Sequence, residues 1–290
     1  MKKNYFWLIG IILLTVTIIY SCKKEDIPSC ECEKEDIPLC NKEDSISTPV
    51  SDINTKIIAH RGYFNTPGSA ENSLTSLIKA SKIGVFGSEC DVYITLDGIP
   101  VVHHDGFIKE FGIQNTNYNV IQNIKLANGE ILPTLSQYLK TLKALDDIIL
   151  FLEIKPHNSN ERNMRAANIV STMVKEEELE NRVVYISFSL DICKELIRIS
   201  PKTPVGYLNG DLKPLELKNL GFSGLCYYYP VIINNLNWIC EAKEIGLSVS
   251  VWTINSQEQM EYFIKQGVDF VITDEPILLM DVINNCKQSN

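Results

Sequence analysis

The sequence predicts an α/β fold, a (β/α)8 TIM barrel with a small insertion after the second strand. Residues 56–290 are enough for one domain of this class, for which about 250 residues are typical. Eight short, apolar, β-prone runs recur along this stretch, with helical patterns between most of them. Strands that alternate with helices indicate a parallel sheet, and eight repeats favour a closed barrel over an open, doubly wound sheet.

The predicted strands are Lys56–Ala59, Gly87–Ile94, Ile148–Ile154, Val183–Ser187, Pro204–Leu208, Gly224–Tyr228, Ser248–Thr253 and Phe270–Ile272. Between the first two, residues 73–83 carry apolar side chains at near-helical spacing. Ser189 is suited to cap a helix over 190–199, and Ser256, in a capping-box pattern, a helix over 257–265. Each of these helices follows a predicted strand, as the barrel requires.

The segment Asp105–Leu135 interrupts this alternation. It is rich in Asn, Gly and Gln, and it is too long for an ordinary loop. We expect it to form a small insertion over the mouth of the barrel, with one short helix. Its position at the mouth predicts an effect on the shape of the substrate that can enter.

Residues 1–21 have the pattern of an export signal. Lys2 and Lys3 precede an almost wholly apolar run, Phe6–Tyr20, which is short for a membrane span. The run ends at Ile19-Tyr20-Ser21-Cys22, which resembles a bacterial lipobox with lipidation and cleavage at Cys22. We therefore expect a lipid-anchored protein of the bacterial cell envelope, facing the periplasm or the outside. An uncut signal anchor is the alternative.

Residues 22–55 are predicted to be a disordered, acidic tether. The unit Lys-Glu-Asp-Ile-Pro occurs twice about ten residues apart, a period too short for a solenoid, and the apolar content is too low for a core. The tether contains Cys30, Cys32 and Cys40. A disulfide staple, a metal on Cys30 and Cys32, or no role at all remain alternatives for these thiols.

The net charge of the chain argues against a nucleic-acid partner. It is −9, and about −11 once Lys2 and Lys3 are removed with the signal, whereas proteins that bind nucleic acid carry basic patches. A phosphate-handling site is not excluded, because a bound cation and a few local Lys or Arg side chains dominate such a site.

Three carboxylates fall at the ends of predicted strands. Glu89 and Asp91 are two residues apart and so lie on one face of a strand, and Glu153 ends the next strand of the barrel. Carboxylates that share a barrel interior need a cation or protons to offset their repulsion. Oxygen ligands suit Mg²⁺ or Ca²⁺ better than Zn²⁺. The alternative to a metal site is a set of structural ion pairs with Arg61 or Lys155.

Two histidines follow strands that bring an acid or a cation. His60 and His104 are predicted to serve as general acid and general base, because their usual pKa suits both roles near neutral pH. His103 competes for the second role, although strand alternation places it on the opposite face. His157, after a proline, is predicted to be solvated.

Other residues at strand ends are candidates for substrate contacts. Arg61 and Lys155 are predicted to hold phosphate oxygens, the first as a fork and the second as a point charge. Trp252 is suited to form an apolar wall, and Tyr228 to reach the substrate with its hydroxyl, with core packing as the alternative for both. Residues 274–276 are interpreted as a cap of the last helix.

These segments together resemble the glycerophosphodiester phosphodiesterase family, over residues 56–283. The order and spacing of the motifs carry the resemblance. The motifs are Ile58-Ala59-His60-Arg61-Gly62, Glu71-Asn72-Ser73, Glu89-Cys90-Asp91-Val92, Asp97-Gly98-Ile99-Pro100-Val101-Val102-His103-His104-Asp105, Leu132-Pro133-Thr134-Leu135, Leu152-Glu153-Ile154-Lys155, Val251-Trp252-Thr253 and Ile272-Thr273-Asp274-Glu275-Pro276.

The resemblance implies metal-dependent hydrolysis of glycerophosphodiesters to glycerol 3-phosphate and an alcohol such as choline or ethanolamine. It implies one divalent cation, Mg²⁺ or Ca²⁺, on Glu89, Asp91 and Glu153. It also implies His60 and His104 as the acid/base pair, and a cyclic phosphate formed by attack of a glycerol hydroxyl and then opened by water. Glu71 matches a position beside the metal and is expected to be a ligand or to orient Arg61. Of these two roles we favour one outside the set of direct metal ligands.

The sequence departs from the family pattern in three places near the barrel mouth. Ala70 replaces a usual proline, Gly106-Phe107-Ile108-Lys109 replaces a common Leu-x-Arg-Thr, and Tyr228 stands where many relatives have histidine. These changes leave the alcohol group open. One rival is a phosphodiesterase or phospholipase D-like enzyme that acts on lysophospholipids or another head-group. A second is an inactive barrel that serves as a surface binding protein. A barrel aldolase or isomerase fits poorly, because Lys155 lies beside Glu153.

Overall fold

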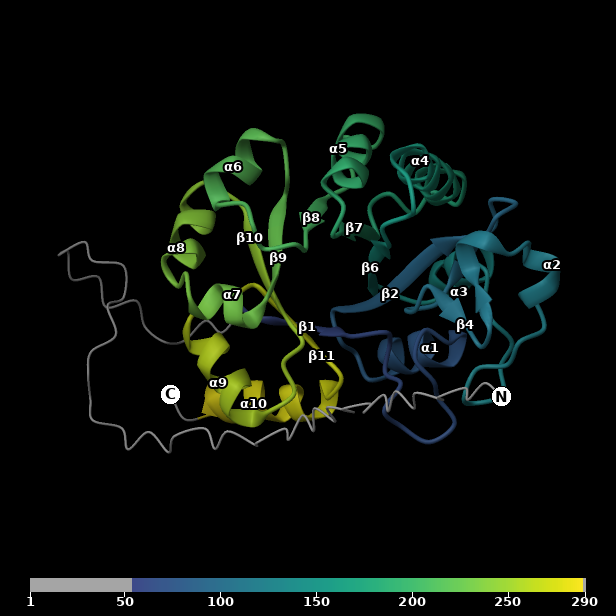
Figure 1. Ribbon diagram of the computed structural model, residues 1–290. Helices are drawn as coiled ribbons and strands as arrows, with labels where there is room; N and C mark the ends of the chain where they lie inside the picture. The colour runs from purple at the N-terminus through teal and green to yellow at the C-terminus, as the bar shows by residue number, and fades with distance from the viewer. Residues whose placement is uncertain (1–53, 289–290) are drawn as a thin grey trace, which may run out of the picture. The chain divides into compact units, whose positions relative to one another are not determined.

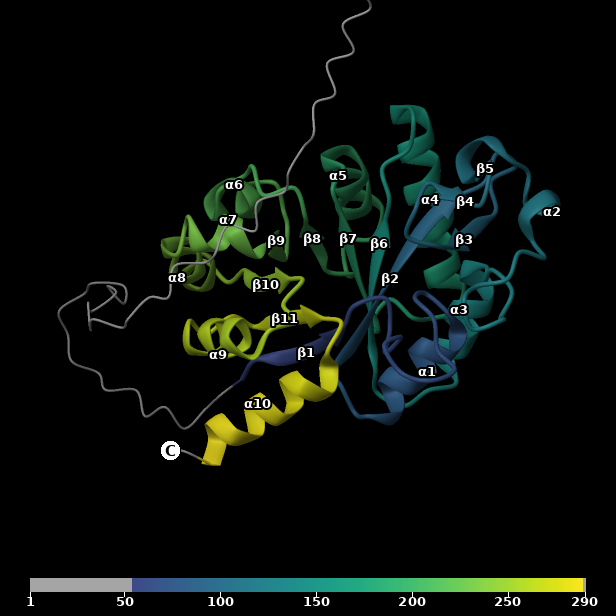
Figure 2. The same cartoon turned by 60° about the horizontal axis from the view of Figure 1, so that its bottom comes forward.

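The computed structural model describes residues 54–288, and it confirms the closed barrel. Eight parallel strands follow one another in the order β1, β2, β6, β7, β8, β9, β10, β11, and β1 pairs with both β11 and β2, which closes the ring (Figures 1 and 2). In the described part of the chain, no helix is long and apolar enough to cross a membrane. The predicted signal peptide, the lipidation site Cys22 and the tether up to residue 53 lie outside the described residues. The end of the predicted disordered tether was wrong, because Thr55 is buried and donates its hydroxyl to the Val268 carbonyl (2.8 Å).

All eight predicted runs contain a barrel strand. The strands are β1 Lys56–Ala59, β2 Gly87–Ile94, β3 Pro100–Val102, β4 Phe107–Ile108, β5 Phe111–Gly112, β6 Ile149–Ile154, β7 Val183–Ser187, β8 Val205–Tyr207, β9 Gly224–Tyr228, β10 Ser248–Trp252 and β11 Phe270–Thr273. Most barrel strands are buried on both faces, because the interior of the barrel fills one side and the helices cover the other. This explains why the runs are almost continuously apolar.

The helices form the outer layer (Figure 1). They are α1 Leu74–Lys82, α2 Tyr118–Ile121, α3 Leu135–Lys143, α4 Asn160–Glu176, α5 Leu190–Ile199, α6 Pro214–Asn219, α7 Tyr229–Ile233, α8 Asn237–Glu244, α9 Gln257–Lys265 and α10 Pro276–Gln288. The predicted caps are confirmed, because the hydroxyls of Ser189 and Ser256 each accept a hydrogen bond from the backbone N–H three residues later. Ser73 caps α1 in the same way.

A small apolar plug fills the barrel interior beneath the strand ends. Its buried members come from six different strands or the residues that follow them: Ile58, Phe151, Ile186, Leu208, Cys226 and Ile272. A larger apolar layer lies between the strands and the surrounding helices. The plug matters for function because it places an apolar floor, which solvates charge poorly, beneath the polar groups.

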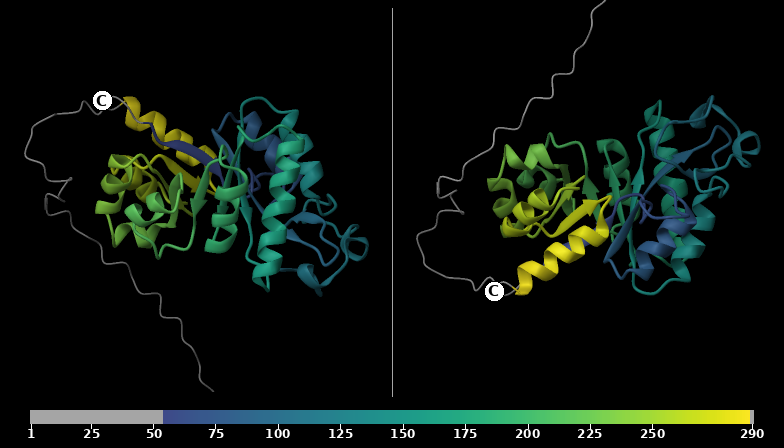
Figure 3. Two further views of the ribbon diagram at one scale, coloured as in Figure 1. Left: turned by 90° about the horizontal axis from the view of Figure 1, so that it is seen from above. Right: turned by 90° about the horizontal axis from the view of Figure 1, so that it is seen from below.

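The insertion between β2 and α3 contains more structure than the sequence predicts. It includes the one short α-helix expected, α2, but β3 also extends the sheet antiparallel to β2, and β4 and β5 form a hairpin. Its own apolar core consists of Val101, Ile108, Ile113, Ile121, Ile124 and Leu132. The insertion lies on the side of the barrel away from α6 and α8 (Figure 3). The Gln114 side chain accepts a hydrogen bond from Asn158 N–H (2.9 Å), which joins the insertion to the loop after β6.

Candidate active site

The register of the sheet brings the predicted site residues together at the carboxyl ends of the strands. Asp91 of β2 pairs directly with Glu153 of β6, and Glu89 lies two residues earlier on the same face of β2. His60 follows β1 and Asp274 follows β11, whose last residues are paired with each other. A cavity of about 130 Å³ opens here, lined by His60, Arg61, Glu89, Asp91, His104, Glu153, Lys155, Ile186, Phe188, Leu208, Trp252, Thr253 and Ile272.

The three carboxylates form a compact buried cluster. One oxygen from each of Glu89, Asp91 and Glu153 lies within 4.8 Å of the other two, and the residues are at most 6% exposed. Burial raises the pKa of Glu89 well above its usual value, and repulsion from Asp91 and Glu153 raises it further. Burial also raises the pKa of Glu153, to about 7, against the opposing effect of Lys155. If all three carboxylates were ionised, the cluster would therefore carry more negative charge than its surroundings balance.

Lys155 and Arg61 supply part of the balance. Lys155 Nζ lies 2.7 Å from Asp91 Oδ1 and 2.8 Å from Glu153 Oε1. Burial would raise the pKa of Asp91, but Lys155 and the Asn72 amide, which donates to Asp91 Oδ2 (2.8 Å), lower it to about 2. The structural ion pairs that were the alternative to a metal site are thus present, and they compensate Asp91 most fully.

The donor set fits a hard divalent cation. Glu89 Oε1 is buried without a hydrogen-bond partner, and the contact of Glu153 Oε1 with Lys155 is an ion pair that leaves the oxygen without a well-aligned hydrogen bond. Two under-satisfied carboxylate oxygens beside a third carboxylate are costly unless a cation completes them. Oxygen ligands of this kind are those that Mg²⁺ and Ca²⁺ take. The structure therefore supports Glu89, Asp91 and Glu153 as residues that could hold a metal ion.

The turn after β1 aims Arg61 into the site. Its backbone N–H donates to Glu89 Oε2 (2.8 Å), and its Nη1 donates to Glu71 Oε2 (2.7 Å). Glu71 thus orients Arg61, as expected, rather than joining the buried carboxylates. The next residue is glycine for two reasons: Gly62 has φ of +79°, and a Cβ there would lie 2.3 Å from Ser76 Oγ.

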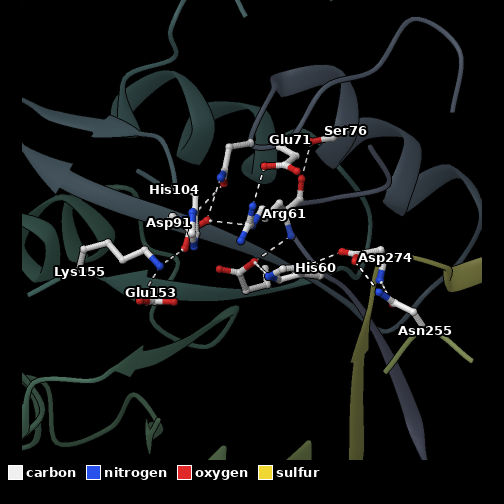
Figure 4. Close-up of polar contacts among 12 residues, drawn as sticks. His60, Arg61, Glu71, Ser76, Asp91, His104, Glu153, Lys155, Asn255 and Asp274 are labelled. Atoms are coloured by element: carbon white, nitrogen blue, oxygen red, sulfur yellow. Dashed lines mark hydrogen bonds and ion pairs between the residues drawn. The ribbon is translucent and has the colours of Figure 1, made fainter. Parts of the chain in front are cut away.

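His60 is held by a carboxylate that sequence reasoning assigned elsewhere. Its Nδ1 lies 2.7 Å from Asp274 Oδ1, and Asn255 donates to Asp274 Oδ2 (2.6 Å), so the three side chains form a chain of polar contacts (Figure 4). The interpretation of residues 274–276 as only a helix cap was therefore incomplete. The other ring nitrogen of His60 lies 4.0 Å from Glu89 Oε2 and faces the cavity.

His104, and not His103, lines the cavity, as strand alternation predicts. Its Nδ1 lies 2.8 Å from Asp105 Oδ1, which fixes the ring. Burial and the nearby Lys155 lower the pKa of His104 below its usual value, while Asp91 opposes this effect. His104 is therefore held mainly in its neutral form near pH 7.

A model of the glycerophosphoryl diester phosphodiesterase family matches residues 60–278. The chain belongs to this family. It is therefore an enzyme, a phosphodiester hydrolase that acts on glycerophosphodiesters.

Relatives of known structure and sequence agree with the family. A crystal structure of a glycerophosphodiester phosphodiesterase from Parabacteroides distasonis has a TM-score of 0.80 and 47% identity, over 82% of this chain and 99% of that one. The glycerophosphodiester phosphodiesterase of Caldanaerobacter subterraneus is 28% identical over 251 residues, 79% of this chain and 98% of its own. An Oleispira antarctica phosphodiesterase in complex with the product sn-glycerol-3-phosphate shares the fold, with a TM-score of 0.69 and 24% identity, over 79% and 96% of the two chains.

Within this glycerophosphodiester phosphodiesterase barrel, aromatic rings line the side of the mouth away from β2. Trp252 lines the cavity, and its Nε1–H donates to the Cys226 carbonyl (2.9 Å). Tyr228 packs against Trp252 but is 45% exposed and lies outside the cavity lining. Packing in the core, the alternative for Trp252 and Tyr228, therefore does not fully describe either residue.

Two polar residues of this family member differ from the sequence-based picture. His157 is buried, so the prediction that it is solvated was wrong: Nε2 accepts the Ile94 N–H (3.0 Å), and the ring packs edge-on against Tyr93. Asn72 also has a part that sequence reasoning missed. Besides its bond to Asp91 Oδ2, it accepts the Asp91 N–H (3.1 Å), so it holds both backbone and side chain of that carboxylate. The only signal was its place in a shared motif.

Proposed function

We propose that this enzyme hydrolyses glycerophosphodiesters to glycerol 3-phosphate and an alcohol, with a divalent cation, Mg²⁺ or Ca²⁺, on Glu89, Asp91 and Glu153. The observation that carries the proposal is the meeting of these three carboxylates with two histidines and two cationic side chains in one cavity. The product named for the Oleispira relative supports the reaction. The cation, when bound, would offset the charge of the carboxylates and polarise the phosphoryl group.

Arg61 and Lys155 would hold the phosphate. Arg61 is always charged, and its side chain is largely buried at the cavity wall, where Glu71 fixes its direction. Burial alone would lower the pKa of Lys155, but Asp91 and Glu153 raise it above its usual value, so the ammonium stays charged. A charged group that is oriented before the substrate arrives can stabilise the negative charge that develops on phosphoryl oxygens.

The two histidines are suited to opposite proton transfers. In the first step a glycerol hydroxyl of the substrate attacks phosphorus, and neutral His104 takes the hydroxyl proton. The bond from phosphorus to the alcohol oxygen breaks, and His60 gives its proton to that oxygen, which leaves a cyclic phosphate. Asp274 supports this role, because its carboxylate lies 2.7 Å from His60 Nδ1 and so orients the other ring nitrogen toward the cavity. Water then opens the ring, with the roles reversed.

Release of glycerol 3-phosphate from glycerophosphocholine tests the proposal. The protein should be assayed with Mg²⁺, with Ca²⁺ and with EDTA, beside Glu89→Gln and His104→Ala. His103→Ala is the matched control, because His103 is adjacent but does not line the cavity. We expect metal-dependent release, lost by at least a hundredfold in both site variants and kept in the control. Equal rates with EDTA, or full activity of His104→Ala, would refute the assignment. A cyclic phosphate as the final product would favour the rival reactions on other head-groups.

The proposal includes a lipid anchor at Cys22 in the bacterial cell envelope. Its support is the short apolar run before Ser21-Cys22. Partition of the expressed full chain into a detergent phase, compared with that of Cys22→Ala, tests this location. We expect the variant to lose the mass of the lipid and to keep its uncut signal; an unmodified Cys22 in the wild type would contradict the anchor.

A further inference from the structure

Three aromatic rings make one continuous surface at the cavity, which we call the aromatic wall: Phe188, Trp252 and Tyr228. Phe188 and Trp252 line the cavity itself, with ring centroids 5.6 Å apart and planes nearly perpendicular. Tyr228 lies against Trp252, with centroids 5.2 Å apart. The wall therefore leads from the floor of the site out to the solvent.

The backbone fixes the position of the wall. Tyr228 and Trp252 are paired residues on the neighbouring strands β9 and β10, so their side chains leave the sheet on the same side. The indole of Trp252 is anchored through its Nε1–H to the Cys226 carbonyl. With its one donor used in this way, the indole offers the cavity a π face and an apolar edge.

The exposure of Tyr228 distinguishes it from the tyrosine before it. Tyr227 is fully buried and donates its hydroxyl to the Leu212 carbonyl (2.7 Å), as a core tyrosine does. Tyr228 is 45% exposed although it sits beside a reaction site. Core packing explains Tyr227 but gives no reason for a large ring at position 228 that remains open to solvent.

We propose that the aromatic wall is a subsite for a quaternary ammonium group on the leaving alcohol, so that diesters of choline are preferred. This inference rests on the proposed function and names its substrate class. Aromatic faces attract cations, and a quaternary ammonium has no N–H groups that need acceptors. A primary ammonium or a polyol needs hydrogen-bond partners to replace the water molecules that it loses on binding. The three rings offer few hydrogen-bonding groups for this purpose.

The test compares three substrates with the metal-loaded protein: glycerophosphocholine, glycerophosphoethanolamine and the 3,3-dimethylbutyl diester, a neutral carbon copy of the choline diester. We expect kcat/KM for the choline diester to exceed that for each of the other two by about three- to thirtyfold. Tyr228→Leu, which removes the ring but stays apolar, should reduce both ratios about threefold or more. Tyr228→Phe, which removes only the hydroxyl, should keep them.

Each result separates one idea from another. Equal turnover of the choline diester and its neutral copy would overturn cation recognition, and ratios unchanged in Tyr228→Leu would overturn the role of the wall. If the two kcat/KM ratios fell as far in Tyr228→Phe as in Tyr228→Leu, the preference would be assigned to the hydroxyl, and this would overturn the proposal as well. Failure to hydrolyse any of the three diesters would instead overturn the proposed function, on which the inference rests. Thermal unfolding of each variant would confirm that it is folded.

Discussion

Replacement of His157 by glutamine should remove a defined part of the pH dependence of stability. The imidazole is buried, its Nε2 accepts the Ile94 N–H, and its Nδ1 has no hydrogen-bond partner. Burial and the nearby Arg162 lower the pKa of His157 to about 4. The folded protein therefore resists a proton that the unfolded chain binds readily. Glutamine can accept the same backbone N–H through its amide oxygen but does not titrate.

The magnitude follows from the two pKa values. The unfolded chain has a pKa near 6.5, so the stabilising effect of neutral His157 is fully present above that pH and is lost as the pH falls toward the folded value of about 4. At roughly 1.4 kcal/mol per pKa unit, the loss between pH 6.5 and 4 is about 3 kcal/mol. This is a large part of the 5–15 kcal/mol (approximately) that stabilises a typical domain.

Urea unfolding of wild type and His157→Gln between pH 7.5 and about 4 measures this difference. Acidic groups of the site titrate in the same range, but they are present in both proteins and cancel in the comparison. We expect the wild type to lose about 2–3 kcal/mol more than the variant on acidification. Parallel curves for the two proteins, separated by a constant amount, would refute a buried neutral His157. The m-values should agree, which checks that both unfold in the same way.

Three further changes test the site and its scaffold. Asp274→Asn replaces the charged partner of His60 with a neutral one and should lower kcat about tenfold with little change in KM, since charged hydrogen bonds are about twice as strong as neutral ones; an unchanged kcat would remove Asp274 from the mechanism. Mg²⁺ or Ca²⁺ at about a hundredfold above its Kd should raise Tm by about 5–10 °C in an EDTA-reversible way, and no shift with either ion would argue against the carboxylate site. Gly62→Ala should cost about 2–4 kcal/mol in urea unfolding, because it combines a positive φ with a clash against Ser76. Gly129→Ala has a similar φ but open space around it, and should cost only about 1 kcal/mol; equal losses in the two variants would show that the clash is unimportant.

The barrel could be predicted from the sequence because its strands are buried on two sides. Such strands read as short apolar runs, and eight of them with helical patterns between most leave few alternative folds. The ends of parallel strands meet at one edge, so the convergence of Glu89, Asp91 and Glu153 followed from the same pattern. The spacing of residues along the chain was therefore sufficient to predict the barrel and the meeting of the three carboxylates.

Features that depend on contacts between distant segments could not be predicted in this way. The pairing of His60 with Asp274 joins residues 214 positions apart, and it exists only because β1 and β11 close the barrel. His157 was predicted to be solvated because it follows a proline after the strand, but Tyr93 and Ile94 of β2 contact its ring and its backbone N–H donates to Asn163 of α4. The hairpin within the insertion was missed since its strands have two residues each and no measurable periodicity.

The charge balance of the site explains why such an arrangement is tolerated in a folded protein. Asp91 is compensated by Lys155 and Asn72, whereas Glu89 and Glu153 are left with raised pKa values above an apolar plug. An evenly compensated cluster would be more stable but would have little affinity for a cation, because the carboxylate oxygens would already be satisfied. The barrel instead fixes two under-satisfied carboxylates where relaxation is blocked by the strands. In the proposed function, a bound cation would restore the stability lost there, so that the same electrostatic imbalance would govern folding, metal affinity and phosphate chemistry.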